Sequence, residues 1–136
     1  MKKQDVMVGY QLINGAKLTK LEDEAKFKVI KVCKQMKPIV EDIQEFVKDA
    51  REKLKGENHE AMEALERKEN KTDEELKTLN EYSQEYTGKV DKCVYDELNT
   101  EVELGYDKLT EDEVKKLVSS NDWNVAQTIA VMTLFE

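Results

Sequence analysis

Apolar residues recur at steps of three or four along residues 25–55, which is the spacing of one face of an α-helix. Acidic residues precede this segment and suit the first turn of a helix, and Gly56 suits its end. The pattern therefore predicts one long helix over residues 25–55, with a kink at Pro38 because proline cannot donate a backbone hydrogen bond. The stripe consists of Ala25, Val29, Val32, Met36, Val40, Ile43, Val47, Ala50 and Leu54.

A second stripe with the same spacing predicts another helix over residues 72–95. Thr72 and Glu75 stand three residues apart at its start, as the two members of a capping box do. Residues 56–71 between the two helices are highly charged, which is typical of a solvated helix extension or an exposed connector. Two long amphipathic helices joined in this way predict an antiparallel helical hairpin.

Two short segments alternate between apolar and polar positions, as half-buried strands do. In residues 1–24 the alternation ends near Val8, and one or two helical turns follow. In residues 96–108 it runs from Leu98 to Tyr106 and includes a glycine, which argues against a helix. We expect the two segments to pair as a short two-stranded β element.

Residues 109–136 have the pattern of a small C-terminal helical pair. Thr110 and Glu113 form a second capping-box signature, and a turn over residues 119–122 separates the two helices. The last helix is apolar on most of its faces, so it should dock into the core or onto a partner. The predicted fold is mainly α: a single domain with a long helical hairpin, a short β element and this helical pair.

Composition agrees with a helical protein of one domain. The 136 residues include only five glycines and one proline, fewer than the turns of an all-β protein require. The formal net charge of -8 repels phosphate backbones and disfavours non-specific nucleic-acid binding. The charge is uneven, because residues 1–37 hold nine lysines against four acids. The acidic surface from Glu41 onward favours solubility, or alternatively imitates a nucleic-acid backbone.

The sequence offers no set of residues for catalysis, metal binding or cofactor binding. His59 is the only histidine and lies in the most polar segment, without a second histidine or a cysteine at ligand spacing. Cys33 and Cys93 lie on apolar stripes, where cysteine acts as a small hydrophobic residue. No stretch approaches the length of a membrane span. We therefore expect a protein that is not an enzyme, has no cofactor and does not enter a membrane.

Two sets of residues are candidates for binding. The lysines Lys26, Lys28, Lys31 and Lys34 lie in a run that ends at Lys37; they form either a solvated helix face or a stripe that binds phosphates. Trp123 begins the last helix, either as a core anchor or as an exposed contact for a partner.

Three stretches together resemble one protein family. They are residues 12–16 (Leu-Ile-Asn-Gly-Ala), the lysine-rich run 26–37 leading into the long helix, and residues 97–104. The core of the third stretch is Leu98, Asn99, Thr100, Glu101 and Val102, and the start of the C-terminal pair follows it. The chain is similar in these features to an uncharacterised family of small helical-hairpin proteins of tailed phages and prophages of Gram-positive bacteria, which have an LLNTEV-like motif.

The resemblance implies a phage context and no particular activity. Together with the missing catalytic residues, it predicts a phage accessory protein that binds another phage or host protein, or a second copy of itself. Such a protein is either a component of virion or tail assembly or an inhibitor of a host defence system. We expect it in the cytoplasm of the host cell or in the virion. The alternative is a nucleic-acid-binding regulator that uses the stripe Lys26–Lys37.

Overall fold

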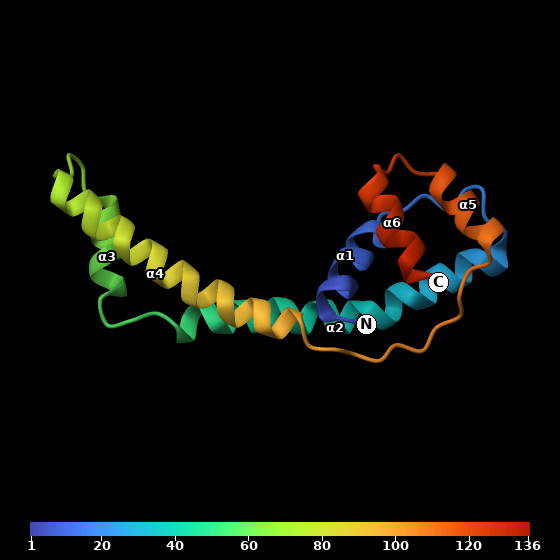
Figure 1. The fold of residues 1–136 in the computed structure, drawn as a ribbon, viewed down its shortest axis with the longest axis horizontal. Helices are drawn as coiled ribbons and strands as arrows, with labels where there is room; N and C mark the ends of the chain where they lie inside the picture. Colours follow the sequence, from blue (N-terminus) through green and yellow to red (C-terminus); the bar gives the residue numbers. More distant parts are fainter. The chain divides into compact units, whose positions relative to one another are not determined.

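The computed structural model describes residues 1–136 and is mainly helical, as the sequence predicts (Figure 1). Its six helices are α1 (Lys3–Asn14), α2 (Asp23–Lys53), α3 (His59–Arg67), α4 (Asp73–Leu98), α5 (Glu111–Ser119) and α6 (Val125–Leu134). α2 continues through Pro38 as one uninterrupted helix. α4 likewise continues through Gly88.

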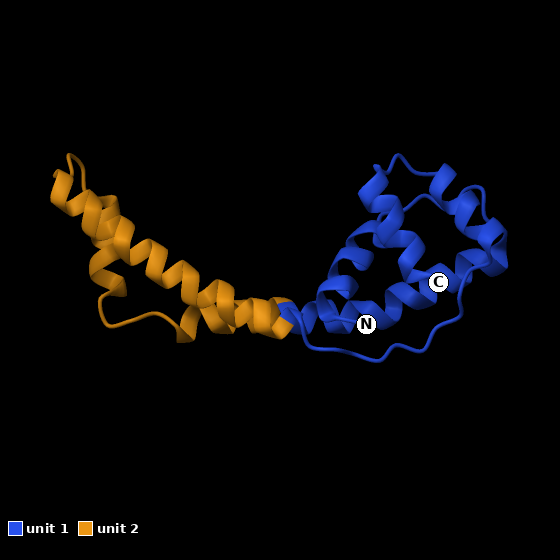
Figure 2. Ribbon diagram, in the orientation of Figure 1, with its two compact units in different colours: residues 1–43, 98–136 blue, residues 44–97 orange.

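The chain divides into two compact units (Figure 2). Unit 1 contains residues 1–43 and 98–136, and unit 2 contains residues 44–97. The long helix α2 begins in the first unit and ends in the second. Its apolar stripe is therefore shared, and only the part after Ile43 belongs to the helical hairpin of unit 2.

Unit 1 has a well-defined apolar core. The α2 stripe from Ala25 to Val40 is buried there against α1, α5, α6 and the chain end. Burial of apolar side chains, those of this stripe included, is the main favourable term in the folding of the unit. The core consists of Val6, Ile13, Leu21, Ala25, Val29, Val32, Met36, Val40, Leu109, Leu117, Val131, Leu134 and Phe135.

The prediction of a two-stranded β element is wrong, because residues 3–14 form α1 and no strand is present. What remains of the expected pairing is one isolated antiparallel bridge between Lys2 and Glu101. The Lys3 amide donates to the Thr100 carbonyl at 3.0 Å, and the Val102 amide donates to the Met1 carbonyl at 2.8 Å. The alternation near Val8 was misleading, because Val6, Gly9 and Ile13 also have helical spacing and are the buried positions of α1.

Capping boxes fix the starts of both C-terminal helices. The Glu113 amide donates to Thr110 Oγ1 at 3.2 Å, and the Thr110 amide donates to Glu113 Oε1 at 2.9 Å, so this predicted box is confirmed. Asn124 and Gln127 form an equivalent capping box before α6, which we did not predict from the sequence. These bonds satisfy amide groups that the first turn of a helix leaves without intrahelical partners.

Unit 2 is a helical hairpin with a much thinner core. The charged connector contains α3, which has no buried residue, and α4 returns beside the end of α2 (Figure 1). Ala50 of α2 and Val90 of α4 are the only buried hydrophobic residues in the unit. The predicted capping box at the start of α4 is confirmed by hydrogen bonds of 3.1 and 3.2 Å between Thr72 and Glu75.

Candidate functional site

The outward side of α6 is the most exposed apolar surface on unit 1. Val125, Ile129 and Met132 follow one another at steps of four and three, and their side chains are 76%, 57% and 44% exposed. The opposite side of the helix, with Val131 and Leu134, is buried in the core. We call the exposed side the α6 face; it consists of Val125, Ala126, Ile129, Met132 and Thr133.

The α6 face carries no charge, because residues 125–135 contain no acidic or basic side chain. Surface helices of globular proteins normally present charged residues to solvent on the side away from the core. Large exposed apolar patches occur at sites of contact with proteins, membranes or ligands. The α6 face therefore has the character of a binding surface.

α1 extends this surface beside α6. A hollow of about 340 Å³ separates the outward sides of the two helices. Ala130 and Thr133 line it from α6, and Val8 and Asp5 line it from α1. A partner that covers the α6 face could therefore insert an apolar side chain beside Val8.

The turn before α6 is held by the side chain of Asn121. Its amide nitrogen donates to the carbonyls of Lys17 at 3.0 Å and Leu117 at 2.8 Å, and its Oδ1 accepts from the Lys17 amide at 2.8 Å. These three bonds tie the end of α5 to the loop between α1 and α2. The sequence predicts a turn here but not this role of Asn121, because its partner Lys17 lies more than a hundred residues away in the chain.

Trp123 does not lie on the α6 face. Its side chain is partly buried and packs against the core of unit 1. In this position it anchors the start of α6 and contributes little surface to a partner.

Two of the four candidate lysines have acidic partners in the structure, and two have none. Lys28 forms an ion pair of 3.4 Å with Glu113 of α5, and Lys26 lies 4.0 Å from Asp23. Together with the capping bonds from Thr110, the contact with Lys28 holds the pKa of Glu113 below its ordinary value. Lys31 and Lys34 are exposed and form no ion pair.

Apolar residues accompany the two unpaired lysines. Phe27 and Ile30 are 63% and 42% exposed and lie on the same side of α2 as Lys31 and Lys34. Beside them runs a groove of about 330 Å³ between α1, the loop that follows it and α2. Cys33 lines this groove, and its partial burial raises the pKa of its thiol above the ordinary value.

The family-like motif lies where α4 ends and the chain meets the N-terminus. Thr100 and Val102 form the backbone bonds to residues 1–3 described above, and Glu101 Oε2 lies 3.8 Å from the N-terminal ammonium group. The Asn99 side chain accepts a hydrogen bond of 3.4 Å from Lys2. Leu98 is the last residue of α4. The motif thus has a structural role in unit 1.

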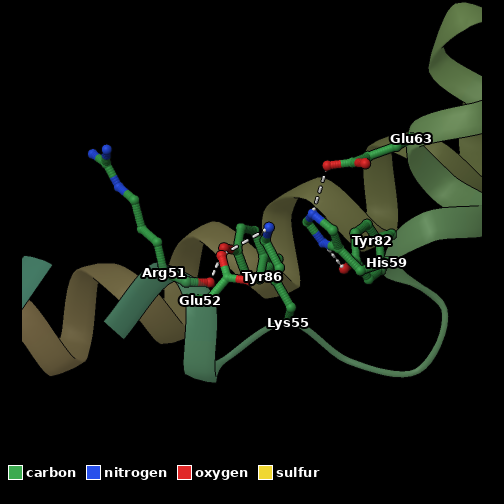
Figure 3. Close-up of polar contacts among 7 residues, drawn as sticks. All are labelled: Arg51, Glu52, Lys55, His59, Glu63, Tyr82 and Tyr86. Carbon is green, nitrogen blue, oxygen red and sulfur yellow. Dashed lines mark hydrogen bonds and ion pairs between the residues drawn. The ribbon is translucent and has the colours of Figure 1, made fainter. Parts of the chain in front are cut away.

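Unit 2 contains a polar cluster around His59, which Figure 3 shows. His59 Nδ1 lies 2.5 Å from the Tyr82 hydroxyl, and Nε2 lies 3.0 Å from Glu63 Oε1. The ring of Tyr86 stacks parallel to that of Tyr82, and its hydroxyl donates to the Arg51 carbonyl at 2.5 Å. These contacts connect α3 and the end of α2 to α4.

The His59 cluster has the residue types of a proton relay, with a histidine between a tyrosine and a glutamate. Both ring nitrogens of His59, however, already have hydrogen-bond partners. Beside the cluster is a shallow hollow of about 200 Å³, which is lined by Tyr82 and Tyr86 but not by His59. The geometry is that of a structural contact that docks α3. The contact is not evident from the sequence, because Tyr82 lies 23 residues beyond His59.

No group of three or more His, Cys, Asp or Glu side chains is arranged to hold a metal ion. None of the helices combines the length and the apolar content that a membrane crossing requires. Comparison with models of known protein families finds no match, and comparisons with curated proteins and with solved structures find none either.

Proposed function

We propose that this chain is a non-enzymatic accessory protein of a tailed phage or prophage that acts by binding another protein. The observation that carries the proposal is the uncharged α6 face, with Val125 and Ile129 more than half exposed on a protein in which 38% of residues are charged. Such exposure costs solvation free energy unless a partner covers it. The phage context rests on the sequence resemblance.

The polar residues that could take part in catalysis already form structural contacts, which supports a role in binding. The one histidine is occupied in docking α3, and the capping carboxylates of Glu75 and Glu113 are occupied at helix starts. The partner is a phage or host protein, or a second copy of this chain. Within this class, the protein serves either virion or tail assembly or the inhibition of a host defence system, in the cytoplasm of the host cell or in the virion.

Affinity capture from phage-infected host lysate, followed by mass spectrometry, tests the proposal. The bait pair is the wild-type chain and the double variant V125E/I129E, which places two charges on the α6 face. L76E is the matched control, because Leu76 is an exposed apolar residue of unit 2. We expect one protein to be enriched by the wild type and by L76E and to be lost with V125E/I129E.

The identity of the captured protein then separates the two branches. Recovery of a virion or tail protein supports assembly, and recovery of a host defence protein supports inhibition. Equal recovery by the wild type and V125E/I129E would contradict the role of the α6 face. Turnover of a substrate by the purified chain would contradict the non-enzymatic proposal.

A further inference from the structure

A second surface of unit 1 differs from the α6 face in chemistry and shares no residue with it. We call it the lysine face; it consists of Phe27, Ile30, Lys31 and Lys34 of α2. Its residues are spaced by three and four positions, so they project from one side of the helix. The face combines two exposed apolar side chains with two exposed ammonium groups.

The fold does not neutralise this positive charge. The neighbouring lysines do have acidic partners: Lys28 pairs with Glu113 of α5, and Lys37 lies 4.0 Å from Glu41. Lys31 and Lys34 have none. Residues 38–136 hold twenty-six acids against thirteen bases, whereas residues 1–37, which include the lysine face, hold nine lysines against four acids.

The groove beside the lysine face supplies room for an apolar side chain. Ile13 and Leu18 line it from α1 and the following loop, and Val29 and Cys33 line it from α2. Lys34 and Lys37 also border it. An apolar floor with ammonium groups along one edge is complementary to a segment that carries large apolar residues on one side and carboxylates next to them.

We infer that the lysine face and its groove bind an acidic amphipathic helix of a partner protein. The apolar side chains of that helix enter the groove and contact Phe27 and Ile30, and its carboxylates contact Lys31 and Lys34. The inference goes beyond the proposed function, because it assigns a second surface with its own class of ligand.

The same features argue against nucleic acid as the occupant. Affinity for a phosphate backbone comes from several basic contacts along a tract, and here only Lys31 and Lys34 are unpaired, with no arginine beside them. Phosphates gain nothing from the apolar floor of the groove. Phe27 alone gives a single stacking platform, whereas single-stranded binding uses successive ones.

A peptide-display selection tests the inference without knowledge of the natural partner. The full-length chain serves as bait for a library of random peptides of about 16 residues, long enough for roughly four helical turns. We expect the enriched peptides to combine several Asp or Glu residues with large apolar residues at helical spacing. An enriched peptide is then labelled, and its dissociation constant is measured by fluorescence anisotropy.

Variants of the bait locate the binding site. We expect K31E/K34E and F27A/I30A each to weaken binding about tenfold or more, and K77E/K92E in unit 2 to leave it unchanged as the matched charge reversal. The peptide with its acids changed to lysines should bind K31E/K34E better than the wild type. Thermal melting shows whether each variant is folded, and V125E/I129E should bind the acidic peptide as the wild type does.

Several results would overturn the inference. They are the absence of any enriched peptide, enrichment of peptides without acidic residues, or peptide binding that K31E/K34E does not change. Binding of a labelled single-stranded oligonucleotide that is lost in K31E/K34E, without peptide binding, would assign the face to nucleic acid. A concentration-dependent dimer of the wild type that K31E/K34E dissociates would assign it to a second copy. V125E/I129E changes only the α6 face, and K31E/K34E changes only the lysine face. Failure of the inference about the lysine face is therefore distinguishable from failure of the proposed function, which rests on the α6 face.

Discussion

Gly9 of α1 lies so close to Leu134 of α6 that a Cβ atom at position 9 would stand 3.1 Å from Leu134 Cδ1. This distance is shorter than an ordinary carbon–carbon contact. The two helices that border the hollow beside the α6 face are therefore packed through a position that only glycine fits without movement of its neighbour.

Replacement of this glycine by alanine is the first prediction. In a helix interior the change usually stabilises by about 0.5–1 kcal/mol, because alanine loses less backbone entropy on folding. At Gly88 of α4 no atom lies within 4 Å of the new methyl group, so we expect G88A to show this gain. The change in the free energy of unfolding should be less favourable for G9A than for G88A by about 1 kcal/mol or more, because the methyl group at position 9 must displace Leu134. Urea unfolding measures both, and an equal gain for the two variants would contradict the close packing.

The buried end of α5 gives the second prediction. Leu117 is fully buried in unit 1, so L117A should lower the free energy of unfolding by about 2–5 kcal/mol through lost burial and a new cavity. L76A makes the same change at an exposed site of unit 2 and should cost less than about 0.5 kcal/mol. Thermal unfolding of the two variants compares them, and similar losses would contradict the described cores.

The start of α4 gives a prediction about pH. Hydrogen bonds from the Lys68 ammonium and the Thr72 amide lower the pKa of Glu75 from 4.5 to about 2. Because the pKa is lower in the folded state than in the unfolded state, the resulting stabilisation is present above about pH 4.5 and is lost as the pH falls toward 2.

The variant E75Q isolates this contribution. It should be less stable than the wild type at neutral pH, and the difference should shrink as the pH falls from about 4.5 to about 2 and disappear below that. Amide hydrogen exchange over the first turn of α4 is the measurement, because it reports the opening of that turn directly. E74Q, in the same turn and exposed, is the control. A difference between E75Q and the wild type that persists unchanged at low pH would contradict this account.

The contact between His59 and Tyr82 gives the fourth prediction. Y82F keeps the aromatic ring but removes the hydroxyl that lies 2.5 Å from His59 Nδ1. Loss of this hydrogen bond should destabilise the docking of α3 by about 1 kcal/mol. Faster amide exchange in α3 would show it. Q84A, which changes an exposed residue of the same helix, is the control, and unchanged exchange in Y82F would exclude a docking role for the hydroxyl.

The parts of the fold that the sequence predicts well are those set by neighbouring residues. The stripe of α2 and the capping boxes of Thr72 and Thr110 depend on spacings of three and four residues, and the structure has them where expected. The residues up to Val8 were predicted as a strand but form the first half of α1, and the helical turns predicted after Val8 form its second half. The contact of Gly9 with Leu134 joins residues at opposite ends of the chain, so local spacing does not show it. When only neighbouring residues are considered, the alternation around Val8 favours a strand.

The two candidate surfaces were likewise predictable from the sequence only in part. The lysine run was visible in the sequence, but which lysines are neutralised depends on Glu113 of α5, which packing brings to Lys28. Likewise, the last helix was evidently apolar, but the side it presents to solvent is decided by its contact with α1. The contact of His59 with Tyr82 joins α3 to α4, so the spacing of residues along the chain does not show it.

The absence of charge along residues 125–135 has a consequence for purification. Ionic strength of about 1 M reduces the screening length to about 3 Å, so washing with concentrated salt should weaken the ionic contacts of a ligand with Lys31 and Lys34. Ligands held by the α6 face should survive the same wash, and sulfate should tighten them, because excluded salts strengthen apolar association. The choice of wash buffer thus decides which set of partners a pull-down retains.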